Sequence, residues 1–176
     1  MSTAAQLQVP TYRVTAHLTA LEVVARTEPG EPRDRRWADR NKLTDVQAGN
    51  LAQVAAAVEW VRGLVGRPVR VTSGFRAGDP RQHGDGSALD IQVDGMSPLE
   101  LAWLIRRHAS EMPSPSLRQV IAEARGTGLN GAMGQGTNRW VHVAVLSARF
   151  HTATAAWLET SDGSSYDALR AAGGNS

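Results

Sequence analysis

The sequence predicts an α+β fold, with a small antiparallel sheet and flanking helices. Residues 44–65 have the apolar spacing of one long amphipathic helix. Several shorter segments alternate between apolar and polar residues, which is typical of strands with one buried face. Two of them, residues 117–124 and 139–146, follow one another across a stretch rich in Gly and Asn. Strands joined without an intervening helix usually pair antiparallel, because a parallel pair needs a long crossover.

The composition is that of one globular domain. The chain has 176 residues, of which 41% are apolar and 20% are charged, and this length supports one core rather than two large ones. No window approaches the run of about eighteen apolar residues that a membrane helix needs, so we expect no membrane span. The 19 basic and 17 acidic residues nearly balance, which argues against a nucleic-acid-binding surface. There is no cysteine, so histidines and carboxylates would have to hold any transition metal.

We divide the chain into a loose N-terminal lead-in (1–14), one domain (15–150) and a C-terminal helix with a frayed tail (151–176). The N-terminus lacks a basic segment followed by an apolar one. We therefore expect no Sec signal peptide and synthesis in the cytoplasm.

The domain begins with a predicted short helix over residues 17–27, where three apolar residues recur at helical spacing. Residues 28–41 are rich in Pro, Gly and Arg and predict an exposed loop.

The best-defined element is the helix over residues 44–65. Thr44 and Gln47, three residues apart, form a capping box, and Gly66 with Pro68 ends the helix. Its apolar stripe, which should face the core, consists of Leu51, Val54, Val58, Val61 and Val65.

Two short strands and a second helix follow. A strand over residues 69–72 leads into a polar, Gly-containing loop over residues 77–87, and another strand covers residues 89–93. Ser97 is then the N-cap of a helix, with Pro98 in its first turn.

The last two strand candidates enclose the Gly- and Asn-rich stretch. An antiparallel pair across it would bring Glu123 near His142, since both lie close to the strand ends. The stretch is long for a hairpin loop, and we interpret it as a mobile lip over a site.

His83, Asp90 and His142 are the candidate metal ligands. Two imidazoles and one carboxylate can hold Zn²⁺ and leave a fourth position open for water. Gly86 and Ala88, between the first two, are small, as expected where a loop folds back so that both side chains point to one atom. The alternatives are a surface loop histidine for His83 and a half-buried strand histidine with one hydrogen bond for His142.

The sequence segments around these residues resemble the motifs of a known protein family. The segments that carry the resemblance are Ser73-Gly74-Phe75-Arg76, His83-x-x-Gly86-x-Ala88-x-Asp90 and Trp140-Val141-His142. They are similar to motifs of the zinc D-Ala-D-Ala carboxypeptidases and their endopeptidase relatives, particularly the branch with phage endolysins that cleave peptidoglycan peptides. The resemblance covers about residues 15 to 146. It implies a Hedgehog/DD-peptidase-like fold and one Zn²⁺ bound by His83, Asp90 and His142.

The resemblance also suggests substrate-binding residues. Arg76 would lie near the pocket, where it could bind a substrate carboxylate with two hydrogen bonds. Ser73 and Trp140 would line the same pocket. The alternative for Arg76 is a structural salt bridge.

The general base departs from the commonest family pattern. Many members carry it three residues before the last ligand, but that residue is Arg139 here, which cannot accept a proton. In the branch that this chain resembles more closely, the acid ends the preceding strand, and Glu123 matches that placement. Glu123 would take a proton from water and deliver it to the leaving amine. Asp85 is a second candidate, and Glu123 could instead be a solvated strand-end charge. Arg81 replaces a family Ser near the first ligand.

We therefore expect a zinc peptidase that hydrolyses peptidoglycan stem peptides or cross-links, as a D,D-carboxypeptidase or endopeptidase. Its partners would be peptidoglycan peptides and, in a virion, other assembly proteins. It would reach the cell wall as a phage lysin or virion component. Arg81 and Arg139 motivate the alternative, a catalytically silent zinc-binding module that docks on the wall or within a phage-type assembly. A weaker alternative is the same fold without a metal.

Overall fold

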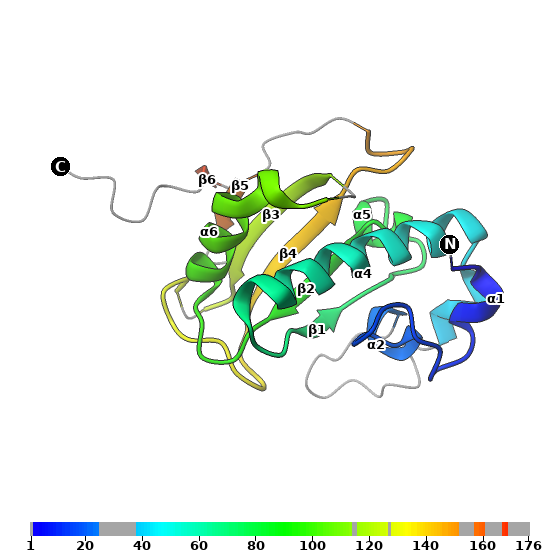
Figure 1. Cartoon of the computed structure of the whole chain (residues 1–176), viewed down its shortest axis with the longest axis horizontal. Coiled ribbons are helices and arrows are strands. Elements are labelled where there is room, and N and C mark those ends of the chain that lie inside the picture. The colour runs from blue at the N-terminus through cyan, green and yellow to red at the C-terminus, as the bar shows by residue number, and fades with distance from the viewer. Residues whose placement is uncertain are drawn as a thin grey trace.

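The structure is a computed structural model of the chain and describes residues 2–24, 38–113, 116–126, 128–151, 157–160 and 167–168. It has an α+β fold, as predicted, with helices α4 and α6 packed against one face of a sheet (Figure 1). Within the described residues, no helix has the length and apolar character needed to cross a membrane.

The sheet has six strands in the order β1-β2-β4-β3-β5-β6. The first four of that order pair antiparallel, as predicted, while β5 runs parallel to β3 and antiparallel to β6. The strands are β1 (Arg70–Ser73), β2 (Ala88–Gln92), β3 (Leu117–Ala124), β4 (Arg139–Val145), β5 (Trp157–Thr160) and β6 (Asp167–Ala168).

The predicted C-terminal helix is wrong where the structure describes this part of the chain. Residues 157–160 and 167–168 are strands β5 and β6 instead. Strand β5 pairs with β3 along the edge that β4 leaves open. Pairing with the edge of β3 satisfies backbone N–H and C=O groups of β5, a non-local gain that a local sequence pattern does not reveal.

Helix α4 (Asp45–Val65) confirms the prediction for residues 44–65. Thr44 and Gln47 form the capping box, and Gly66 ends the helix with φ of 62°. Of the predicted stripe, Leu51, Val54, Val58 and Val61 are buried, and Val65 is partly buried.

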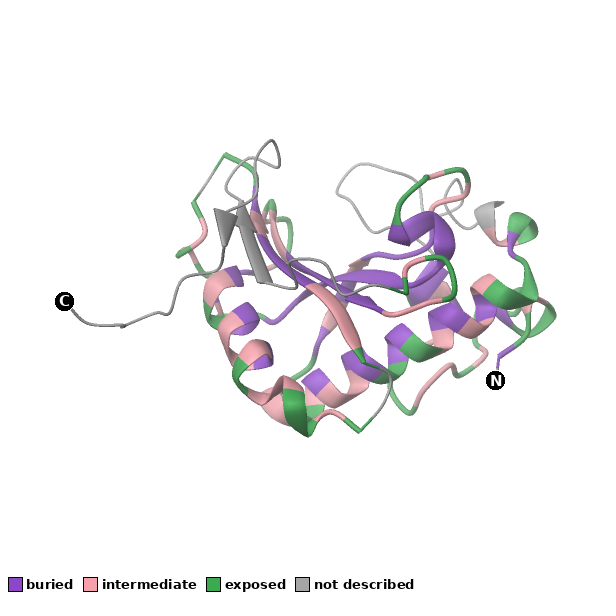
Figure 2. Cartoon of the chain, turned by 90° about the horizontal axis from the view of Figure 1, so that it is seen from above, coloured by how far each residue is buried: buried purple, intermediate pink, exposed green. Residues whose placement is uncertain are grey.

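Helix α6 (Pro98–His108) also begins as predicted, because Ser97 and Glu100 cap each other's backbone N–H groups. The short 3-10 helix η2 (Ala109–Glu111) continues it. Together α4 and α6 bury the inner face of the sheet, and Figure 2 shows buried residues along the central strands and on the helices beside them.

The N-terminal segment packs more tightly than a loose lead-in. Helix α1 (Ala4–Leu7) has its own capping box, Leu7 is fully buried, and the Ala4 N–H donates to Asp45 Oδ1 at 2.8 Å. These contacts join residues 2–7 to the start of α4.

The predicted helix over residues 17–27 is present in part as α2 (Ala20–Val24). It starts later because Glu22 Oε2 accepts a hydrogen bond from the Thr19 N–H at 2.8 Å, which caps the first turn. The predicted loop over residues 28–41 falls largely outside the described residues, and η1 (Ala38–Lys42) occupies its end.

Alternation along β2 and β4 separates core from site. Leu89 and Ile91 on β2, with Val141 and Val143 on β4, belong to the core that α4 and α6 cover. Asp90 and His142 alternate with them and therefore point from the opposite face. The same two strands thus build both the core and the candidate site.

Candidate metal centre and active site

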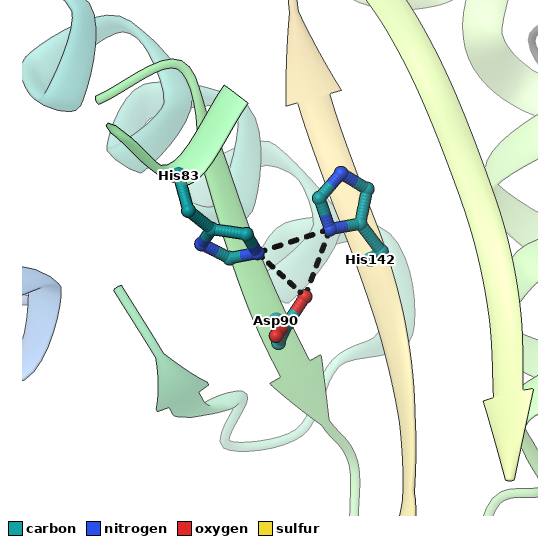
Figure 3. Close-up of side chains that lie close together, drawn as sticks. All are labelled: His83, Asp90 and His142. Carbon is teal, nitrogen blue, oxygen red and sulfur yellow. Dashed lines mark hydrogen bonds and ion pairs between the residues drawn. The ribbon is translucent and has the colours of Figure 1, made fainter. Parts of the chain in front are cut away.

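His83, Asp90 and His142 each bring one atom to a common point (Figure 3). Asp90 Oδ1 lies 3.2 Å from His83 Nε2 and 2.9 Å from His142 Nδ1, and the two nitrogens are 3.2 Å apart. All three residues are buried. In the part of the chain that the structure describes, this is the one group of three such side chains placed to hold a metal ion, and it is the predicted set.

The separations of the three atoms fit a metal ion. Tetrahedral zinc, with bonds of about 2.0–2.2 Å, places neighbouring ligand atoms roughly 3.3 Å apart. The observed 2.9–3.2 Å requires an outward shift of only a few tenths of an ångström. Two imidazoles and one carboxylate are also a donor set that zinc commonly uses. The group can therefore hold a metal ion.

Strand pairing positions two of the three ligands. Asp90 on β2 and His142 on β4 are direct partners in the antiparallel register. Paired residues in antiparallel strands point to the same face with their side chains close together. The register thus brings together two residues that are far apart in sequence.

His83 comes from helix α5 (Gln82–Asp85), a single turn, rather than from the loop predicted for residues 77–87. Gly86 ends this turn with φ of 76°, and a Cβ there would lie 2.6 Å from the Gln47 carbonyl oxygen on α4. Only glycine tolerates both conditions, so the expectation of a small residue between the ligands is confirmed at Gly86. Helix α5 therefore packs closely against α4, and this packing fixes the position of His83.

The second nitrogen of His83 also has a partner. Its Nδ1 lies 2.8 Å from the carbonyl oxygen of Gly74. A carbonyl oxygen can only accept, so Nδ1 carries a proton, and Nε2 is the nitrogen that faces Asp90 and His142 and could bind a metal ion. A Cβ on Gly74 would lie 1.9 Å from the Val23 carbonyl oxygen, so close packing accounts for this glycine.

Asp90 is held in its charged form. Burial alone would raise the pKa of Asp90, but the charges and hydrogen bonds of His83 and His142 outweigh burial and hold this pKa well below its usual range. A carboxylate that stays ionised is a better metal ligand than a neutral acid.

Arg76 and Ser73, predicted to bind substrate, contact each other and a ligand. Arg76 Nη2 donates to Ser73 Oγ at 2.8 Å and to Asp90 Oδ2 at 3.1 Å. Arg76 Nη1 lies 3.8 Å from Asp79 Oδ2. These contacts favour the salt-bridge alternative for Arg76, while its contact with substrate stays a prediction. Asp79 was not identified from the sequence as a partner of Arg76. The one signal for it is that an acid lies three residues after the arginine in the sequence.

Glu123 lies on the same face as the ligands. In the β3–β4 register Ile121 is opposite His142 and Glu123 is opposite Trp140, so Glu123 is a diagonal neighbour of His142. Burial raises the pKa of Glu123, the charge of Asp90 adds to the rise, and His142 partly opposes it. The structure therefore brings Glu123 into electrostatic range of the site, as the strand pairing predicted.

Trp140 stands directly opposite Glu123. The Arg125 guanidinium lies 5.4 Å from the centre of its ring. The indole N–H is buried and has no hydrogen-bond partner among the described residues. Trp140 is thus placed beside Glu123.

Asp85, the second candidate base, has structural partners. Its Oδ2 accepts hydrogen bonds from Ser147 Oγ at 2.6 Å and from Asn50 Nδ2 at 3.2 Å. Asp85 therefore joins α5 to α4 and to the end of β4, which leaves Glu123 as the better placed carboxylate.

Arg81 and Arg139, the two departures from the family pattern, both have partners outside the metal cluster. The Arg81 side chain is 71% exposed and contacts Asp79. Arg139 donates to the carbonyl oxygens of Gly128 at 3.0 Å and Ala132 at 3.2 Å, across the Gly-rich stretch.

The described part of that stretch is also tied to the turn between β2 and α6. The Met133 N–H donates to the Met96 carbonyl at 2.6 Å, and the Gly95 N–H donates to the Met133 carbonyl at 2.9 Å. These hydrogen bonds anchor Met133 at that turn, while the mobility of the rest of the stretch stays a prediction.

Comparison with known proteins adds no relative. No protein-family model, no curated protein and no solved structure matches this chain.

Proposed function

We propose that this chain is a zinc-dependent peptidase that hydrolyses a peptide bond in bacterial peptidoglycan. The observation that carries the proposal is the buried cluster of His83, Asp90 and His142 with Glu123 on the same face of the sheet. Three converging donors and a nearby carboxyl group that can take a proton support metal-assisted hydrolysis as the reaction class.

The roles of the residues follow from their positions. His83 Nε2, Asp90 Oδ1 and His142 Nδ1 would hold the ion. When bound, zinc supplies Lewis-acid polarisation of the scissile carbonyl and makes water more acidic. Glu123 would accept a proton on its carboxylate from the attacking water and return it to the leaving amine nitrogen. Burial raises the pKa of Glu123, which makes its carboxylate a stronger proton acceptor and so assists the first of these transfers.

The substrate class rests on sequence resemblance. The segments around Arg76, His83 and Trp140 resemble those of the zinc D-Ala-D-Ala carboxypeptidases and their endopeptidase relatives. We accordingly propose stem peptides or cross-links of peptidoglycan as the substrate. A D,D-carboxypeptidase or an endopeptidase acting on the wall as a phage lysin or virion component would use this chemistry.

The experiment combines metal analysis with product analysis. Purified protein should contain about one zinc per chain, and mass spectrometry of digested sacculi should show new peptide ends that identify the bond. Glu123→Gln should keep the zinc and lose about 10²- to 10⁴-fold in turnover. Glu111→Gln, at an exposed glutamate paired with His108, is the matched control and should keep full activity.

Two outcomes would contradict the proposal. Protein that binds zinc and cell wall but releases no peptide would be the silent docking module. Full activity of the Glu123→Gln protein would remove Glu123 from the reaction.

A further inference from the structure

The two oxygens of Asp90 have different partners. Oδ1 lies against both ligand nitrogens, at 3.2 Å from His83 Nε2 and 2.9 Å from His142 Nδ1. Oδ2 instead accepts a hydrogen bond from Arg76 Nη2 at 3.1 Å. One oxygen therefore faces the metal position, and an arginine occupies the other.

Arg76 is held in place from several sides. Its Nη2 and Nε both donate to Ser73 Oγ, at 2.8 Å and 3.2 Å. Ser73 is the partner of Asp90 in the β1–β2 register, so the hydroxyl sits beside the carboxylate that the guanidinium must reach. On its other side, Nη1 lies 3.8 Å from Asp79 Oδ2.

The backbone of Arg76 is tied to the site as well. Its N–H donates to the carbonyl oxygen of His83 at 3.2 Å. The side chain of Arg76 is 25% exposed, and that of Asp90 is 7% exposed. The ion pair is thus mostly shielded from water, where a charge-assisted hydrogen bond fixes geometry more firmly than at the surface.

We propose that Arg76 is a positioning residue that restricts Asp90 to binding the metal through Oδ1 alone. The inference rests on the zinc site proposed above. A carboxylate can bind a metal with one oxygen or with both, and the second mode would fill the coordination position that a hydrolytic site keeps open. With Oδ2 engaged by Nη2, that mode requires breaking the ion pair. Arg76 would therefore keep the fourth position available for the reacting groups.

This role differs measurably from a substrate-binding role. An arginine that binds a substrate carboxylate would change KM on substitution and leave metal affinity as it was. A positioning residue changes metal affinity and the coordination number of the ion without any substrate present. Partners that orient metal ligands typically contribute 10- to 100-fold to metal affinity.

The test compares Arg76→Ala and Arg76→Lys with Arg81→Ala. Both Arg81 and Arg76 contact Asp79, but Arg81 has no described contact with Asp90. Arg81→Ala therefore removes one positive charge beside Asp79 and leaves the ion pair of Asp90 intact. Zinc affinity is measured by competition with a chelator. Coordination is read from visible absorption of the Co²⁺-loaded proteins, since four-coordinate Co²⁺ absorbs far more strongly than ions with five or six ligands.

We expect the Arg76→Ala protein to bind zinc about 10- to 100-fold more weakly and to lose intensity in the cobalt spectrum. Arg76→Lys keeps the charge but loses the planar fork, so it should also weaken binding, though less. Arg81→Ala should match the wild type in both measurements. Ser73→Ala, a milder change, should lower zinc affinity in the same direction and serves if Arg76→Ala does not fold by circular dichroism.

Three results would overturn the inference. They are unchanged zinc affinity and cobalt spectrum in Arg76→Ala, wild-type behaviour of Arg76→Lys, and an equal loss in Arg81→Ala. None of these measurements involves peptide turnover, so they remain informative if no peptidoglycan is cleaved. If the wild-type protein binds no zinc, the proposed function itself fails, which is a different and recognisable result.

Discussion

The side chains of Glu123 on β3 and His142 on β4 project from the same face of the sheet, and the two residues are offset by two positions in the β3–β4 register. The offset places a carboxyl group beside the metal cluster without making it a ligand. A general base needs this arrangement, because it must reach the attacking water while its oxygens stay off the ion.

The position of Glu123 predicts the pH dependence of turnover. Burial raises its pKa above the ordinary 4.5, and only the deprotonated carboxylate can accept a proton. Activity should therefore fall as the pH drops through this raised value, so the acid limb of the kcat/KM profile should lie above 4.5.

The profile is measured on a soluble muropeptide at constant ionic strength. Glu123→Gln should remove the limb together with most of the activity. A limb centred at or below the ordinary glutamate value would show that a different group is titrating.

Zinc should stabilise the folded protein. An ion that binds only the native state raises the free energy of unfolding by about 2.7 kcal/mol when free zinc is 100 times its dissociation constant. Removing zinc with a chelator should lower Tm, and returning it should restore Tm. His142→Ala removes one of the three donors, so most of this zinc-dependent shift should disappear.

The control for His142→Ala is His108→Ala, at a partly exposed histidine paired with Glu111. That protein should show the full zinc-dependent shift in Tm. An equal loss of the shift in both proteins would argue against His142 as a ligand.

Local patterns predicted much of the fold. Helix α4 was found because Thr44, Gln47 and Gly66 mark its ends in the sequence itself. The three residues that could hold a metal ion were brought forward by the small residues around them and by the family-like motif, and the structure places them together. Strand β5 was missed because its parallel pairing with β3 is a long-range event that no local pattern encodes.

The surroundings of the ligands were harder to predict than the ligands. The Nδ1 partner of His83 is a backbone carbonyl, that of Gly74, and any residue type supplies one. The ion pair between Arg76 and Asp90 depends on how β1 and β2 are aligned. The sequence left open whether Arg76 binds a substrate carboxylate or forms a salt bridge within its own chain. Both interactions use the same guanidinium group, so the residue type does not distinguish them.

Asp90 should make the metal-free protein sensitive to acid. Its pKa in the folded state lies below the ordinary value of 3.8, despite the opposing effect of burial, because His83 and His142 favour the charged form. A depressed pKa contributes stability above the unfolded-state value, and this stability is lost as the pH falls toward the folded-state pKa.

The free energy of unfolding of the metal-free protein should accordingly fall as the pH drops below about 4. Urea titrations between pH 7 and pH 3 would measure it. Asp90→Asn should be less stable at neutral pH and show a shallower decline on acidification. Parallel declines in both proteins would assign the acid sensitivity to other groups.

Gly86 should not tolerate a side chain. Its φ of 76° is unfavourable for other residues, and a Cβ would meet the Gln47 carbonyl oxygen at 2.6 Å. Gly86→Ala should cost about 2 kcal/mol or more and displace α5, with a loss of zinc affinity. The matched control is Gly49→Ala inside α4, where a Cβ would meet nothing within 4 Å.

Gly49→Ala should stabilise the protein by about 0.5–1 kcal/mol, because alanine is the better helix former. The two alanine substitutions should thus change the urea midpoint in opposite directions. A neutral Gly86→Ala would show that α5 can move away from α4 at little cost.

Arg139 should act on the Gly-rich stretch and leave the metal site as it is. Its hydrogen bonds to the carbonyl oxygens of Gly128 and Ala132 hold that stretch across the start of β4. A Cβ on Gly131 would come within 2.2 Å of the Arg139 guanidinium, so the arginine lies directly against the backbone there. Arg139→Ala should speed amide hydrogen exchange in residues 128–138, including the N–H of Met133.

Zinc affinity should stay at the wild-type value in Arg139→Ala, because the ligands hold their places through β2, β4 and α5. Turnover of the Arg139→Ala protein also tests the alternative of a catalytically silent zinc-binding module. That alternative assumes that an arginine at position 139 prevents catalysis. If Arg139→Ala gained turnover over an inactive wild type, arginine would be the inhibitor. Faster exchange in the stretch, with zinc affinity and turnover preserved, would instead identify Arg139 as the residue that holds the stretch at the start of β4.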